Sequence, residues 1–132
     1  MAHPERIIPT PDLGKPEQFG YSNVVKAGSL VFLAGQCAID KDYNSSGDFA
    51  AQSRECLERV ISAVEAAGGT KDDIVTMTVY MLDVRKGRIF TEIRKEIFER
   101  DFPASTVVGV AQLMPPDALV EVQAMAVLSE RE

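Results

Sequence analysis

The longest apolar run of the chain, Leu30 to Gly35, contains no polar residue. A strand with one solvated face alternates apolar and polar residues, so this run predicts a central strand with both faces covered. The segment Tyr21–Lys26 before it is also strand-like, and Ala27-Gly28-Ser29 between the two predicts a hairpin. The first third of the chain is therefore expected to build the middle of a β-sheet.

Helical and strand patterns alternate through the rest of the chain. Apolar residues recur at helical spacing over 48–67 and 89–99, and Gly68-Gly69 is a typical stop for the first of these helices. Further strands are predicted from residues rich in Val, Ile, Thr, Tyr and Met, over 74–82, 106–113 and 119–128, with a short strand around 6–8. A Pro115-Pro116-Asp117 turn separates the last two.

The predicted order, β-β-β-α-β-α-β-β, indicates one α+β domain spanning residues 1–132. Right-handed crossovers place both helices on one face of a mixed sheet. The other face lacks a cover but carries Val, Met and Ala, so we expect the chain to associate with copies of itself.

Charge and cysteine content narrow the classes of partner and the compartment. Lys and Arg total 14 against 20 Asp and Glu, a net charge of −6, which argues against nucleic acid and anionic membranes as partners. No apolar stretch reaches membrane-spanning length, and the N-terminus lacks the apolar core of a signal sequence. Cys37 and Cys56 are isolated and are interpreted as reduced thiols in a core. We expect a cytoplasmic protein.

Common catalytic motifs for phosphate, dinucleotide, zinc or serine chemistry do not occur, and His3 is the single histidine. We therefore expect no metal and no cofactor. Glu121 stands out because it interrupts the apolar run 119–128. It is either a carboxylate paired with a cation at a sheet edge or subunit seam, or a cleft carboxylate able to move a proton or orient water.

Other candidate residues have equally ordinary interpretations. Tyr21 is either a packing residue or a cleft hydroxyl, and Gly35-Gln36 either allows close backbone packing or forms a backbone nest for a ligand oxygen. Thr91 and Ser105 are by default surface hydroxyls.

Four segments together resemble the Rid family, also called YjgF/UK114, which includes enamine/imine deaminases. The segments cover most of the chain after Gly20 in the family's order: Gly20-Tyr21-Ser22 with 30–36, 51–53 through 65–69, 73–75 with 78–83, and Phe102-Pro103-Ala104-Ser105-Thr106 with 119–127. The resemblance implies a chorismate-mutase-like fold, a homotrimer whose sheets line a central barrel, and ligand clefts between subunits.

The resemblance also implies roles for individual residues. Deaminating members use a glutamate on the last strand to orient water, and Glu121 matches it; Tyr21 and the turn at Gly35 match ligand-contacting positions. Ser105 stands where such members have a carboxylate-binding arginine, Val107 replaces a cleft cysteine, and Thr91 replaces a common asparagine. A serine replaces neither the charge nor the planar fork of a guanidinium. Arg88 and Arg94 are candidates for a substitute cation.

Two functions follow from this comparison. The first is hydrolysis of a small enamine, imine or related metabolite by water activated at Glu121, with Tyr21, Gly35, Gln36, Thr91, Ser105 and Val107 shaping the cleft. The second is a non-catalytic trimer that binds a small molecule or regulates a partner. Endoribonuclease activity, attached to some members, is disfavoured because the chain lacks a basic stripe with interleaved aromatics and a histidine pair.

Overall fold

The computed structural model describes residues 3–9 and 13–130 and arranges the described strands in one mixed six-stranded sheet, of order β1-β2-β3-β6-β4-β5. The strands are β1 (Glu5–Ile7), β2 (Val24–Ala27), β3 (Leu30–Leu33), β4 (Ile74–Met81), β5 (Ala104–Gly109) and β6 (Val120–Val127). The helices are α1 (Phe49–Ala66) and α2 (Gly87–Phe98), and three short 3₁₀ turns are η2 (Pro16–Phe19), η3 (Lys71–Asp73) and η4 (Val84–Lys86).

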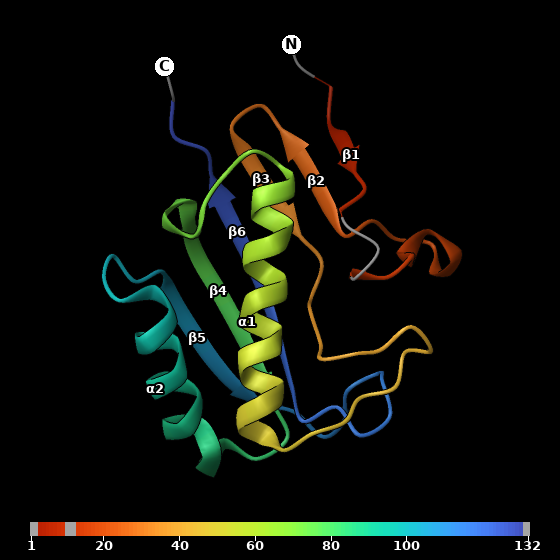
Figure 1. Ribbon diagram of the computed structural model, residues 1–132, viewed down its shortest axis with the longest axis vertical. Coiled ribbons are helices and arrows are strands. Elements are labelled where there is room, and N and C mark those ends of the chain that lie inside the picture. The colour runs from red at the N-terminus through yellow and green to blue at the C-terminus, as the bar shows by residue number, and fades with distance from the viewer. Residues whose placement is uncertain (1–2, 10–12, 131–132) are drawn as a thin grey trace.

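Both helices lie on the same face of the sheet, as predicted (Figure 1). The connection through α2 joins the parallel strands β4 and β5, and β6 inserts antiparallel between β3 and β4. The core under the helices combines apolar side chains of α1 with the inward residues of β3, β4 and β6. This arrangement confirms the α+β class and the mixed sheet.

Local signals explain where α1 begins and ends. The Asp48 carboxylate accepts a hydrogen bond from the backbone N–H of Ala51 at 2.9 Å, which satisfies one of the free donors of the first turn. At the other end Gly68 has a φ of 92°, a left-handed conformation that glycine adopts without strain. The predicted helix over 48–67 is therefore confirmed to within one residue at each end.

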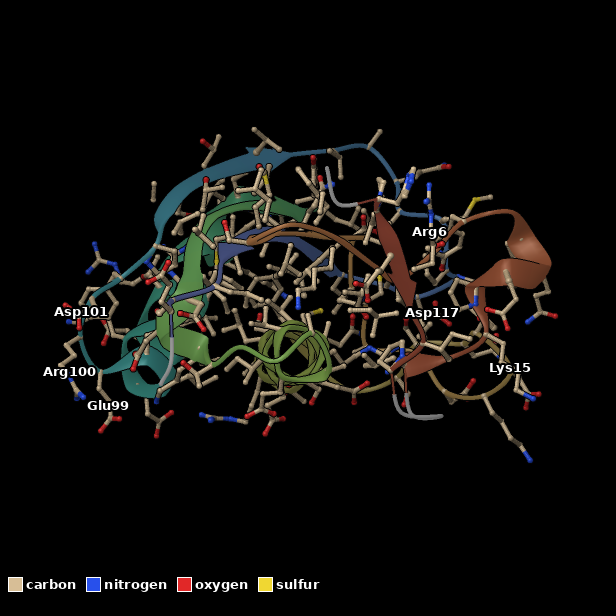
Figure 2. The ribbon with its side chains drawn as sticks, turned by 90° about the horizontal axis from the view of Figure 1, so that it is seen from above. Arg6, Lys15, Glu99, Arg100, Asp101 and Asp117 are labelled. Atoms are coloured by element: carbon tan, nitrogen blue, oxygen red, sulfur yellow. The ribbon has the colours of Figure 1, made fainter. Side chains whose placement is uncertain are left out.

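The face of the sheet opposite the helices is open in the single chain. Along β6 the residues alternate, with Val120, Val122, Ala124 and Ala126 buried and the intervening side chains partly or fully exposed. Figure 2 shows α1 end-on on one side of the sheet, with side chains and no helix on the other. This alternation places Glu121 on the open face of the sheet.

The single chain covers only one of the two faces of the apolar run, which was predicted to have both faces covered. Val31 and Leu33 are buried, but Leu30 and Phe32 are 40% and 39% exposed. The strand is central, between β2 and β6, yet only one of its faces is covered, by α1. The apolar residues on the second face of the strand form an apolar surface of the single chain. They do not pack against another layer of its core.

Several boundaries also differ from prediction for reasons of pairing. The strand predicted over 106–113 runs from Ala104 to Gly109, because its single partner β4 ends at Met81, opposite Gly109. The strand predicted from Tyr21 begins at Val24, the first residue paired with both β1 and β3. Helix α2 starts two residues early because η4 leads directly into it.

Candidate functional site

A cavity of about 520 Å³ lies where the chain leaves the end of β3 and passes beside β6. Its walls come from the N-terminal segment, the loop after β3, helix α1, the loop before β6 and β6 itself. The lining residues are Leu13, Phe19, Tyr21, Asn23, Ala34, Gly35, Gln36, Cys37, Ile39, Tyr43, Arg59, Met114, Pro115, Pro116 and Glu121. Lys15 and Asp117 lie next to lining residues and are at one end of the molecule. Glu99, Arg100 and Asp101 lie at the other end (Figure 2).

Glu121 enters the cavity from the sheet face that the helices leave open. The Cys37 thiol donates a hydrogen bond to Glu121 Oε1 at 3.1 Å. On the other side, a Cβ added to Gly35 would lie 2.2 Å from Glu121 Oε2, so only a glycine at this position leaves room for the carboxylate as it stands. The sequence-predicted pair of Gly35 and Glu121 is therefore brought together, and Cys37 fixes the orientation of the carboxylate.

Burial keeps the hydroxyl and thiol of the cavity protonated. The pKa of Cys37 is raised well above its ordinary value, first by burial and then by the charge and the hydrogen bond of Glu121. The pKa of Tyr21 is also raised, mainly by burial, with smaller contributions from Tyr43, Cys37 and Glu121. Both side chains are therefore hydrogen-bond donors at neutral pH.

The aromatic residues frame the opening of the cavity. Tyr21 is 43% exposed, and Phe19 packs edge-to-face against Tyr43 with ring centroids 4.8 Å apart. The Tyr43 hydroxyl in turn accepts a hydrogen bond from the backbone N–H of Lys15 at 3.0 Å. This contact ties the N-terminal segment to the loop after β3, so two segments distant in sequence form one wall.

A chain of hydrogen bonds runs from the loop after β3 into α1. Asn23 Nδ2 donates to the Leu13 carbonyl at 2.9 Å, and Gln36 Nε2 donates to both Asn23 Oδ1 and the Ala34 carbonyl at 3.2 Å. Arg59 Nε then donates to Gln36 Oε1 at 3.3 Å. The Gln36 side chain is thus held at both ends, and its role is to connect Arg59 to the wall of the cavity.

The other three residues predicted for the cleft do not line this cavity. Ser105 and Val107 lie on the edge strand β5, two strands from β6 and opposite Met77 and Val79 of β4. Thr91, on α2, donates a hydrogen bond from Oγ1 to the Arg88 carbonyl at 2.9 Å. Within one chain these residues form a separate surface on the helix side of the sheet edge.

The two candidate substitute cations also lie away from the cavity. Arg94 Nη1 donates to Ser105 Oγ at 2.5 Å, and its guanidinium stacks over the Phe90 ring at 5.2 Å. Arg88, on the same helix, is exposed. A guanidinium does therefore stand beside Ser105, but it comes from α2 and is not in the wall of this cavity.

Sequence reasoning missed Cys37, on the loop after β3, and Arg59, on α1, as residues of the cavity. Cys37 was interpreted only as a core thiol, and Arg59 was not singled out. The available signal was spacing, since Arg59 follows Cys56 by three residues on the buried side of α1. No group of three or more His, Cys, Asp or Glu side chains in the described residues is placed to hold a metal ion.

The comparisons with known proteins fit this architecture. The family model described as "Endoribonuclease L-PSP" matches residues 15–128, nearly all of the sheet, both helices and the cavity. The chain belongs to this family. It includes proteins named after YjgF and UK114, so the resemblance found in the sequence is confirmed.

Two relatives show the range of names in the family. A RutC family protein of Pyrococcus horikoshii is 37% identical over 114 residues, covering 84% of this chain and 90% of the relative. A protein of Dermatophagoides farinae named 2-iminobutanoate/2-iminopropanoate deaminase is 31% identical over 128 residues, covering 95% of this chain and 98% of the relative.

Solved structures of family members have the same fold. A YjgF/YER057c/UK114 family member of Mycobacterium tuberculosis is 34% identical, with a TM-score of 0.77 over 86% of this chain and 91% of that one. E. coli TdcF, solved with bound serine, is 34% identical with a TM-score of 0.76 over 83% of this chain and 88% of that one.

In the described part of the present chain, no helix is both long and apolar enough to cross a bilayer.

Proposed function

We propose that this family member hydrolyses the C=N bond of a small imine or enamine metabolite, with the attacking water positioned by Glu121. The observation that carries the proposal is the Glu121 carboxylate inside the cavity, held at Oε1 by the Cys37 thiol and facing Gly35 through Oε2. A fixed carboxylate beside an open volume is what a water-activating group requires.

The chemistry needs one water and returns one ammonia. Glu121 accepts the proton of a water as its oxygen bonds to the imine carbon, and the C=N bond becomes a C–N single bond. The nitrogen takes that proton, which gives a neutral carbinolamine. Glu121 then transfers the hydroxyl proton of the carbinolamine to the amino group as the C–N bond breaks, so ammonia leaves and a carbonyl compound remains. The Tyr21 hydroxyl, a donor at neutral pH, lines the same cavity and is suited to hydrogen-bond the nitrogen or the new oxygen.

The relatives support the choice of reaction. One relative, from Dermatophagoides farinae, carries an imine deaminase name, and E. coli TdcF binds serine, a small amino acid. Ribonuclease activity, which the family description names, is not proposed here. The net charge of −6 opposes RNA, and the single histidine His3 does not line the cavity.

The active assembly is proposed to be a homotrimer formed through the open sheet faces. Exposed apolar side chains on that face, among them Leu30, Phe32 and Val127, support the association. In such an assembly the neighbouring protomer would bring Thr91, Ser105 and Val107 of its edge strand and α2 to the cavity. The cleft would then combine residues of two protomers.

A second function is a ligand-binding trimer without catalysis. The observation that favours it is Ser105, which stands where the family resemblance implies a carboxylate-binding arginine. Both functions use the same cavity and differ only in what Glu121 does.

The test is imine hydrolysis by the purified protein. An amino-acid oxidase generates imines in situ from a panel of amino acids, and semicarbazide traps whatever remains. We expect faster loss of imine with the wild-type protein and no acceleration with Glu121→Gln. A folded protein without acceleration across the panel would overturn the proposed reaction.

A further inference from the structure

Arg59 places a permanent positive charge in the wall of the cavity. Its side chain belongs to the buried face of α1, the residue is only 7% exposed, and it lines the cavity. Burial lowers the pKa of Arg59, yet a guanidinium keeps its proton at any pH at which the protein is folded. Among the described lining residues, Arg59 is the only one with a cationic side chain.

The guanidinium is held in a defined orientation. Nε donates to Gln36 Oε1, and Gln36 is itself fixed by Asn23 and by the Ala34 carbonyl. These supporting residues line the same cavity. A long side chain whose plane is fixed by such contacts loses little further freedom when it binds a planar anion.

Arg59 and Glu121 act on the same groups with opposite sign. The charge of Arg59 lowers the pKa of Cys37 and Tyr21, whereas the charge of Glu121 raises both. Both charges also contact one three-residue segment, Arg59 through Gln36 and Glu121 through Cys37 and Gly35. The cavity therefore has a cationic and an anionic side separated by a short stretch of chain.

The remaining wall is apolar and the volume is generous. Leu13, Phe19, Ile39 and the Met114-Pro115-Pro116 loop supply carbon surface around about 520 Å³, a volume in the range of cavities that hold drug-sized ligands. A three-carbon acid would leave much of the space of the single-chain cavity unfilled. A branched or aromatic side chain would remove the apolar wall from water.

We propose that Arg59 is the carboxylate anchor of this protein and that its substrates are imino acids with a bulky apolar side chain. This inference rests on the proposed function of the site. The carboxylate binds at Arg59 on α1, the C=N carbon lies toward Glu121, and the side chain occupies the apolar wall. The carboxylate anchor thus comes from α1. On β5, Ser105 stands where the family resemblance implies a carboxylate-binding arginine.

The test measures ligand binding rather than turnover, so it is independent of whether the protein hydrolyses imines. The probe is ketoleucine, the oxo acid that hydrolysis of the leucine imine would release, titrated calorimetrically into the wild-type protein. Methyl isobutyl ketone has the same carbon branch with a methyl group in place of the carboxylate. Pyruvate has the carboxylate without the branch.

We expect ketoleucine to bind more tightly than pyruvate, and Arg59→Gln to weaken ketoleucine binding by about tenfold or more. The same variant is expected to leave the weak binding of the neutral ketone within about twofold. Arg59→Lys, which keeps the charge without the fork, should lose less than Arg59→Gln. Arg54→Gln removes a charge from the exposed side of the same helix and should leave the binding of ketoleucine and of the neutral ketone unchanged.

Three results would overturn the proposal. One is wild-type protein that does not bind ketoleucine, or binds pyruvate as tightly. Another is an equal weakening of ketoleucine binding and ketone binding in Arg59→Gln, which would show that the guanidinium has a structural role. The third is loss of ketoleucine binding in Arg94→Gln with Arg59→Gln unaffected, which would place the anchor beside Ser105.

Discussion

The Cys37 thiol donates a hydrogen bond to Glu121 Oε1 at 3.1 Å, joining the loop after β3 to a carboxylate of β6 that lies 84 residues later. The contact holds the one carboxylate that lines the cavity among the described residues. It also fixes a protonated thiol beside a charged group, and both partners can be examined by substitution.

The Cys37 contact predicts how stability changes at alkaline pH. The thiol titrates near 9.0 when unfolded, but the pKa of Cys37 in the folded chain is raised far above this value. Above about pH 9 the unfolded chain therefore loses a proton that the folded chain keeps, and stability falls as pH rises. Between about pH 8 and about pH 10, the free energy of unfolding measured in urea should fall more for the wild type than for Cys37→Val.

The comparison is internally controlled because Cys56, whose pKa is raised to about 12 by burial, is present in both proteins. Equal alkaline slopes in the wild type and the variant would contradict the burial of the Cys37 thiol beside Glu121.

Gly35→Ala tests the space left for the carboxylate. The new Cβ would lie 2.2 Å from Glu121 Oε2, so the carboxylate must move while the backbone need not. We expect imine hydrolysis to fall by about tenfold or more, since misplacement by about 1 Å is costly to catalysis. The thermal unfolding midpoint should change by only a few degrees.

Gly87→Ala is the matched control for that substitution. Gly87 has helical backbone angles at the start of α2, and a Cβ there meets nothing within 4 Å. We expect it to raise the free energy of unfolding by about 0.4–1 kcal/mol without affecting hydrolysis. Similar activity in both alanine variants would contradict the packing of Gly35 against Glu121.

Phe32→Glu tests the open face of the sheet. Phe32 lies opposite Met125 on this face and is 39% exposed, so a carboxylate there puts charge into the proposed interface of the trimer. We expect the wild type to have three times the mass of one chain by light scattering, and the variant to dissociate. Glu17→Gln, on the exposed η2 turn, serves as a control. An unchanged mass for Phe32→Glu would exclude this face from the assembly.

Asp48→Ala tests the start of α1, the helix that carries Arg59. Losing the side-chain acceptor for the Ala51 N–H should lower the free energy of unfolding by about 1 kcal/mol, measured in urea. Asp48→Asn keeps an acceptor and should recover most of the loss. If both variants lost equally, the charge of Asp48 would matter more than its hydrogen bond.

The sequence could predict most of the fold because its local signals agree. Glycines after α1 and regular apolar spacing mark the helix, and the apolar run over 119–128 marks β6. The two covered faces expected for β3 are not both covered within one chain, because an apolar run looks the same whether another layer or another copy covers it. Leu30 and Phe32 carry that ambiguity.

The site could be predicted only in part. Short sequence motifs identify Tyr21, Gly35 and Glu121, and the structure brings these residues to one cavity. Arg59 was missed because an arginine within a helical pattern usually points to solvent. Its burial depends on Gln36, which reaches the helix only after the chain turns at the end of β3. That contact is tertiary: the spacing from Cys56 places Arg59 on the buried side of α1, but it does not show that Gln36 holds the side chain there.

The most direct test of the account is the fate of Glu121→Gln in two assays on one preparation. The amide keeps the size of the side chain but cannot accept a proton from water. We predict that calorimetric binding of ketoleucine stays within about threefold of the wild type, while imine hydrolysis falls by about a hundredfold or more. A variant that binds and hydrolyses like the wild type would contradict catalysis at Glu121.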